Sequence, residues 1–102
     1  MNNTISEAIR NRRIIRFLYA DEAGNIHKRV VEPYAYGVTK QGNEAIRCYQ
    51  IGGSSETEIP GWKLFLVDRM TGLIITDETF EGCAPGYAHG DKGLNPIYCR
   101  IP

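Results

Sequence analysis

The sequence contains no long apolar run. Its longest uninterrupted apolar stretches are far too short to span a bilayer, and its polar N-terminus lacks the apolar core of a secretory signal. The cysteine count is odd, at three. Without a secretory signal, this count favours reduced thiols over a disulfide framework. We therefore expect an intracellular, cytoplasmic protein with no membrane association.

Metal-binding and catalytic patterns are also missing. Cys83, His89 and Cys99 are separated by five and then nine residues, and no Cys-x2-Cys pair is present, so no metal site is predicted. Ser54 and Ser55 follow two glycines but lack a Gly-x-Ser-x-Gly frame, and the same stretch lacks the lysine of a phosphate loop. The sequence therefore predicts no catalytic residue and no cofactor.

The chain has no net charge, because twelve basic residues balance twelve acidic ones. A strong overall attraction to nucleic acid is thereby excluded. The distribution is nevertheless uneven, since residues 1–50 hold eight Lys and Arg against five Asp and Glu. An anion-binding face built from the first half of the chain is compatible with this asymmetry.

Glycine and proline are plentiful, with eleven and five residues in a chain of 102. They favour short strands and turns over a helical bundle. The length predicts a single domain over residues 1–102, with its core at about residues 4–81 and an irregular tail at residues 82–102. Turns every eight to fifteen residues predict a mainly β fold, a small antiparallel barrel of five to six strands with one short N-terminal helix.

The helix is predicted at residues 4–12. Thr4 begins a Thr-x-x-Glu spacing typical of a capping box. Ile5, Ala8 and Ile9 share one helical face, which is the pattern of a helix that packs on a core.

The strand predictions rest on runs of β-branched and aromatic residues bounded by turn residues. Side chains alternate along the third of these runs, so Arg47 and Tyr49 point to one side and Cys48 and Gln50 to the other. Pro33 has no amide to donate and marks a strand end, a bulge or an edge. The predicted strands cover residues 14–20, 26–32, 44–51, 62–67, 73–79 and 97–101.

Several segments follow one another in a characteristic order. They are the helix Ile5–Arg13, Phe17-Leu18-Tyr19, Arg29-Val30-Val31-Glu32-Pro33-Tyr34, Ile46-Arg47-Cys48-Tyr49, Trp62–Met70 and Thr76–Phe80. Over roughly residues 5–80, their order and spacing resemble the WYL domain family. The Trp-Tyr-Leu triplet that names the family falls at Glu44-Ala45-Ile46, where only the aliphatic third position is kept.

This resemblance implies both a fold and a function. WYL domains are similar to Sm-like and SH3-like barrels, and they usually occur in bacterial transcription regulators. They are thought to sense ligands, with single-stranded DNA or nucleotides as the favoured class. The resemblance thus implies a stand-alone, non-enzymatic regulatory domain that binds an anionic ligand.

Basic and aromatic residues of the resembling segments are candidates for that ligand. Guanidinium groups hold phosphates, and nearby aromatic rings stack on bases without reading their sequence. An alternative at each arginine is pairing with a neighbouring acid, such as Arg29 with Glu32. The candidate ligand-binding residues are Arg29, Arg47, Arg69, Tyr19, Tyr49 and Lys63.

A protein-interaction module is the competing hypothesis. Small barrels have exposed edge strands to which an extended partner peptide or a second copy can add. A contiguous apolar patch at the surface, in place of a basic cleft, would favour this second function.

Overall fold

The computed structural model describes residues 2–55, 57–88 and 90–102. Its elements confirm a mainly β chain with six antiparallel strands and one short N-terminal helix. In chain order they are α1 (Asn3–Arg10), β1 (Arg13–Ala20), β2 (Ile26–Val38), β3 (Glu44–Gly53), β4 (Gly61–Leu66), the 3-10 turn η1 (Val67–Arg69), β5 (Met70–Thr79) and β6 (Ile97–Arg100).

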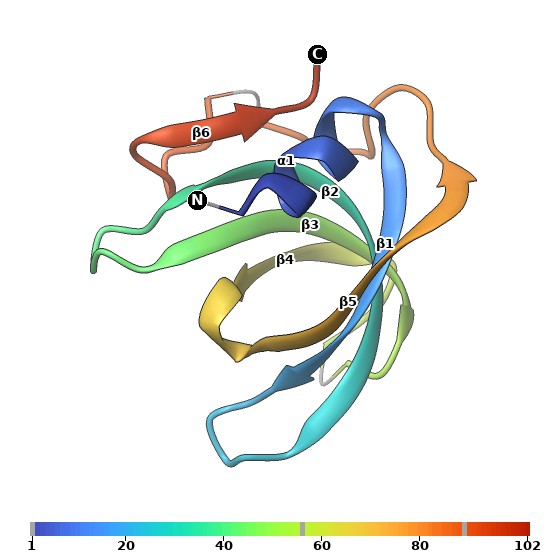
Figure 1. Cartoon of the computed structure of the whole chain (residues 1–102), viewed down its shortest axis with the longest axis vertical. Coiled ribbons are helices and arrows are strands. Elements are labelled where there is room, and N and C mark those ends of the chain that lie inside the picture. The colour runs from blue at the N-terminus through green and yellow to red at the C-terminus, as the bar shows by residue number, and fades with distance from the viewer. Residues whose placement is uncertain (1, 56, 89) are drawn as a thin grey trace.

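The predicted barrel is wrong, because the sheet does not close. The strands are ordered β4-β3-β2-β1-β5, so β4 and β5 are the two edges, and β6 is added beside β2. A barrel would require β4 and β5 to pair, but η1 joins them without a ladder between them. The amide of Leu66, where β4 ends, instead donates to the hydroxyl of Tyr19 at 3.0 Å. The result is a strongly curled but open sheet (Figure 1).

Strand β2 is the longest, at 13 residues, and it pairs with three other strands. Its residues 26–31 pair with β1, residues 29–38 pair with β3, and residues 35–37 pair with β6. The register with β3 shifts between Pro33 and Ala35. Of the three roles predicted for Pro33, the structure thus shows the bulge, which lets the strand continue past a residue that cannot donate to the ladder.

Helix α1 begins before the predicted capping box. The side chain of Asn2 caps it by accepting hydrogen bonds from the amides of Thr4 (3.0 Å) and Ile5 (3.2 Å). The prediction that Thr4 is the cap is therefore wrong, because Asn2 already satisfies the amides at this end of the helix. The predicted apolar face is confirmed, since Ile5 and its neighbours on that face are buried.

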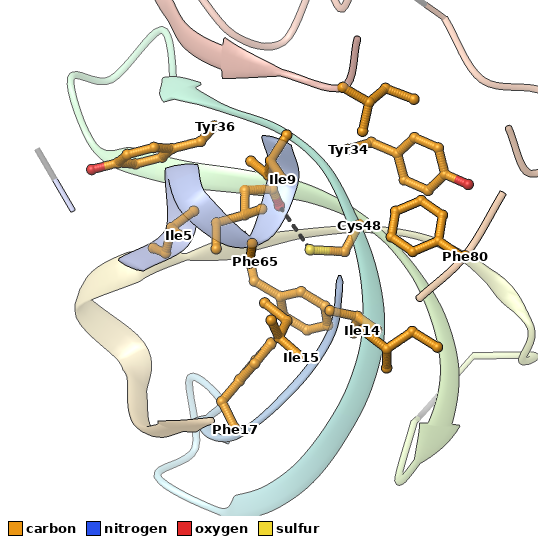
Figure 2. Close-up of a cluster of buried hydrophobic side chains, with 14 residues drawn as sticks. Ile5, Ile9, Ile14, Ile15, Phe17, Tyr34, Tyr36, Cys48, Phe65 and Phe80 are labelled. Carbon is orange, nitrogen blue, oxygen red and sulfur yellow. Dashed lines mark hydrogen bonds between the residues drawn. The ribbon is translucent and has the colours of Figure 1, made fainter. Parts of the chain in front are cut away.

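The main core lies between α1 and one side of the sheet, which we call the inner face. Side chains of alternate strand residues point into it, including the ring of Phe17, which meets that of Phe65 edge-on at 5.2 Å (Figure 2). Cys48 lies in the same layer and donates its thiol to the carbonyl of Ile46 at 3.9 Å. The buried apolar side chains of this core include Ile5, Ala8, Ile9, Ile14, Ile15, Phe17, Val31, Tyr36, Ile46, Cys48 and Phe65.

The described residues of the tail that precede β6, 82–88 and 90–96, pack on the opposite side of β3 and β4, which we call the tail face, whereas β6 pairs with β2 and Ile101 joins the main core. Leu94 joins Ala35 and Ala45 in a second, smaller cluster there. The indole of Trp62 donates to the carbonyl of Pro85 at 2.6 Å and stacks on Tyr87, with ring centroids 5.6 Å apart. Both sides of the central strands are thus covered, and each carries some of the candidate residues.

Candidate functional site

Arg29 occupies the inner face beside the aromatic core. It lies opposite Phe17 in the β1–β2 ladder, and its guanidinium carbon is 5.9 Å from the ring centroid of Tyr19 and 5.7 Å from that of Phe65. One guanidinium nitrogen donates to the carbonyl of Ser54. Only 8% of the residue is exposed, and its Nε has no hydrogen-bond partner among the described residues.

Lys63 brings a second positive charge to the inner face. It pairs with Cys48 across the β3–β4 ladder, which directs its side chain to the same side as Arg29. Burial, and next the charge of Arg29, lower the pKa of Lys63. Within residues 2–55, 57–88 and 90–102, neither cation forms an ion pair. The alternative partner Glu32 instead accepts a hydrogen bond from the Tyr34 hydroxyl at 3.0 Å.

Gln50 completes this group, although sequence patterns assigned it no functional role. It is fully buried, and its Nε2 donates to the carbonyls of Gly52 and Ser54, both at 2.9 Å. Arg29 and Gln50 therefore converge on the same Ser54 carbonyl. The signal that marks Gln50 is its place in β3, because a polar residue on the apolar side of an alternating strand must find partners inside the protein.

Tyr19 links this group to Arg69. Both residues line a shallow pocket of about 300 Å³ next to the β1–β2 turn, and Arg69 donates to the carbonyl of Ala20 at 3.3 Å. Asp21 and Glu22 line the same pocket. Arg69 thus shares its pocket with two carboxylates, although it forms no ion pair with them among the described residues.

Arg47 and Tyr49 lie on the tail face, away from Arg29. The Nε and a terminal nitrogen of Arg47 bind the two carboxylate oxygens of Asp91 at 2.7 and 3.3 Å. Tyr49 packs against Trp62, with ring centroids 5.1 Å apart. Arg47, Trp62 and Asp91 line a cleft of about 490 Å³ between the tail and the sheet.

The ion pair of Arg47 makes it an anchor for the tail. Burial acts to raise the pKa of Asp91, but hydrogen bonds from Arg47 and the Gly93 amide outweigh it and hold that pKa below its usual value. Asp91 is therefore ionised at neutral pH and neutralises Arg47. The strand period of two explains the division of the candidates, because Arg47 and Tyr49 alternate with the inward-facing Cys48 and Gln50.

The described part of the chain lacks the features of two other kinds of site. No helix there is long and apolar enough to cross a membrane, and no group of three or more possible metal ligands is present. Cys83 is exposed, and Cys99 is half-buried with its thiol 3.7 Å from the Ser6 carbonyl. His89 lies outside the described residues.

The inward-facing Arg29 and the strands from β1 to β4 belong to a segment that a family model recognises, since the model of the WYL domain matches residues 1–75. The chain belongs to the WYL domain family. WYL domains are generally ligand-binding regulatory modules and are generally non-catalytic. Arg29, Gln50 and Lys63 lie inside the matched segment, whereas Asp91 lies beyond it. No curated protein and no solved structure matches this WYL domain.

Proposed function

We propose that this WYL domain binds a phosphate-bearing ligand, single-stranded nucleic acid or a nucleotide, at the pair formed by Arg29 and Lys63, without catalysis. The observation that carries the proposal is that no carboxylate of residues 2–55, 57–88 and 90–102 forms an ion pair with either cation. Arg29 is 8% exposed, yet no carboxylate of the described residues pairs with it. A buried cation without a counter-ion is costly, and a bound phosphate would remove that cost.

Lys63 and Tyr19 are the half-exposed members of this group, whereas Arg29 is buried and its Nε has no hydrogen-bond partner among the described residues. A phosphate held by Lys63 from the solvent side can approach the Arg29 guanidinium from the same direction. Tyr19 offers an aromatic surface at the rim for a base or sugar, and such contacts tolerate any base. The tail-face pair of Arg47 and Tyr49 is not needed by this ligand.

The test is fluorescence anisotropy of labelled oligothymidylate, and of a labelled nucleotide, against the wild type and Lys63→Gln. A charge-assisted hydrogen bond contributes about 1.5–3 kcal/mol, so Lys63→Gln should weaken binding at least about tenfold. Between about 50 and 200 mM salt the affinity should fall steeply, and less steeply for the variant, because one phosphate contact has been removed.

Lys28→Gln is the matched control. It removes the same charge from β2, one residue before Arg29, at an exposed position on the other side of the strand. It should leave the affinity within about twofold of wild type, as expected for a surface change that touches no ligand. Equal weakening by both variants would place the phosphate elsewhere, and no binding to DNA or nucleotide at low salt would refute the proposal.

A further inference from the structure

The outer side of β1, β2 and β5 exposes large apolar side chains to solvent. The exposed fractions are 45% for Leu18, 60% for Ile26 and 46% for Ile74. The ladders place these residues together, since Leu18 lies opposite Lys28 on β2, and Arg16 lies opposite Ile74 on β5. We call this surface the open face and define it by Arg16, Leu18, Ile26, Lys28 and Ile74.

A groove of about 230 Å³ crosses the open face. Arg16, Leu18, Lys28 and Ile74 line it together with Gly72, beside which there is open space. The β1–β5 register shifts between Arg16 and Leu18, so the ladder is bulged at this point and the groove follows the bulge. A recess lined by aliphatic side chains is a better receptacle for a side chain than a flat surface.

All of the charge on the open face is positive. Arg16 and Lys28 alternate with the aliphatic residues, and neither forms an ion pair with any described residue. The outward ladder positions Ala20, Val30 and Thr71 next to them carry no charge, and Glu32, two residues beyond Val30 on β2, accepts a hydrogen bond from the Tyr34 hydroxyl. An occupant that buries the aliphatic side chains must therefore supply carboxylates for two cations, or leave them desolvated and unpaired.

We infer that the open face docks an acidic amphipathic segment of another protein, in which aliphatic side chains alternate with Asp or Glu. The aliphatic side chains of such a segment cover Leu18, Ile26 and Ile74, and its carboxylates meet Arg16 and Lys28. The open face points away from the Arg29–Lys63 pair. The inference therefore stands independently of the proposed phosphate ligand.

The chemistry of the open face argues against two other occupants. A second copy that docks through its own open face would bring the same two cations, and the five residues that define the face supply no carboxylate to meet them. Nucleic acid would find cations but no exposed ring on which a base could stack, because Phe17, the aromatic residue among those that line the groove, packs its ring into the core and is 2% exposed. Exposed aliphatic area combined with positive charge is the complement of an acidic amphipathic chain.

The experiment measures anisotropy of three short labelled peptides with the full chain: alternating Leu and Glu, alternating Leu and Lys, and alternating Ser and Glu. We expect the Leu–Glu peptide to bind at least about tenfold more tightly than either of the others. Amide chemical shifts should then move in β1, in the first half of β2 and in β5. Equal binding of the Leu–Glu and Leu–Lys peptides, or shifts confined to other strands, would overturn the inference.

Reversing the charges of Arg16 and Lys28 tests the same inference in a second way. The double variant R16E/K28E should lose about tenfold in affinity for the Leu–Glu peptide and gain affinity for the Leu–Lys peptide. The matched control R10E/K40E changes the net charge equally at two exposed positions outside the open face, and it should bind like wild type. Three outcomes would each contradict a protein segment as occupant. They are similar losses of affinity in both variants, absence of binding by all three peptides, and changes in the amide chemical shifts of the open face caused by oligothymidylate or anionic vesicles instead.

Discussion

The hydroxyl of Tyr36 is buried between a carboxylate and the start of α1. It donates to Glu44 at 2.5 Å and accepts a hydrogen bond from the Asn2 amide at 2.7 Å. Burial, followed by the hydrogen bond to Glu44, raises the pKa of Tyr36 to about 12. Burial likewise raises the pKa of Tyr34 and of the Cys48 thiol. Deprotonation of these groups is therefore less favourable in the folded chain than in the unfolded chain.

We predict that stability falls as the pH rises from about 10 to 12. The unfolded chain releases tyrosine protons near pH 10, whereas folded Tyr36 holds its proton up to a pKa of about 12, so the folded state binds more protons in this interval. Urea unfolding at pH 8 and at pH 11 measures the loss. Tyr36→Phe should show a shallower alkaline decline than wild type, and equal stability of the wild type at both pH values would contradict the prediction.

Part of the candidate site was predictable from residue chemistry alone. The alternation of Cys48 and Gln50 with Arg47 and Tyr49 correctly divided β3 into two faces. It could not show that Gln50 shares a carbonyl with Arg29, because Ser54 belongs to a loop whose path no periodicity specifies. Whether side chains from separate strands converge depends on strand register and on loop path. The sequence therefore predicted which face of β3 each candidate residue occupies, but not which residues form the site together.

At the level of single elements, the end of β3 is tightly constrained by the neighbouring backbone of β2. Gly53 has a φ of 82°, and a Cβ at this position would collide with the carbonyl group of Lys28. Gly42, in the β2–β3 turn, has a similar φ of 87°, but a Cβ there would meet no atom within 4 Å. The two glycines thus share a backbone conformation and differ in their surroundings.

We predict that Gly53→Ala lowers the free energy of unfolding by more than about 3 kcal/mol, because left-handed strain and a backbone collision act together. Gly42→Ala should cost only about 1–2 kcal/mol, from the strain alone. Urea denaturation of both variants measures the difference. A cost for Gly53→Ala no larger than that for Gly42→Ala would show that the backbone of β2 yields at Lys28.

For the molecule as a whole, the tail is held to the sheet by the β2–β6 ladder and by side-chain contacts farther along it. The ion pair of Arg47 and Asp91 joins residues 44 positions apart, and local patterns cannot foresee such a pairing. Local patterns likewise cannot show whether a sheet closes on itself, which is why the predicted barrel was wrong. The strand runs were correctly found, but whether β4 reaches β5 depends on η1 and on the Tyr19 hydroxyl that takes up the Leu66 amide.

We predict that Asp91→Asn lowers the unfolding free energy by about 1–3 kcal/mol, because it leaves half-buried Arg47 without its counter-ion. Trp62 is the single tryptophan and contacts the tail, so its emission should shift to the red as the tail loosens. In the wild type, the stabilisation by the Arg47–Asp91 ion pair is present above about pH 4 and disappears as the pH falls through the depressed pKa of Asp91.

Asp77→Asn provides the control for the tail. It makes the same substitution at the exposed ion pair with Arg13, whose atoms are 3.9 Å apart, and should cost less than about 0.5 kcal/mol. It should also leave the Trp62 emission unchanged. Equal effects of the two variants would mean that Arg47 and Asp91 do not anchor the tail.

Strand β2 pairs with three other strands, and the last of them to be synthesised is β6. The second half of β2 lies open along one side until β6 arrives, and β6 begins at Ile97, far along the chain from the end of β2 at Val38. A ribosome adds about 5–20 residues per second, so this gap takes on the order of several seconds to synthesise. Throughout that interval the edge next to Ala35, Tyr36 and Gly37 has no strand to pair with, and a nascent chain in this state is most exposed to mispairing with its neighbours.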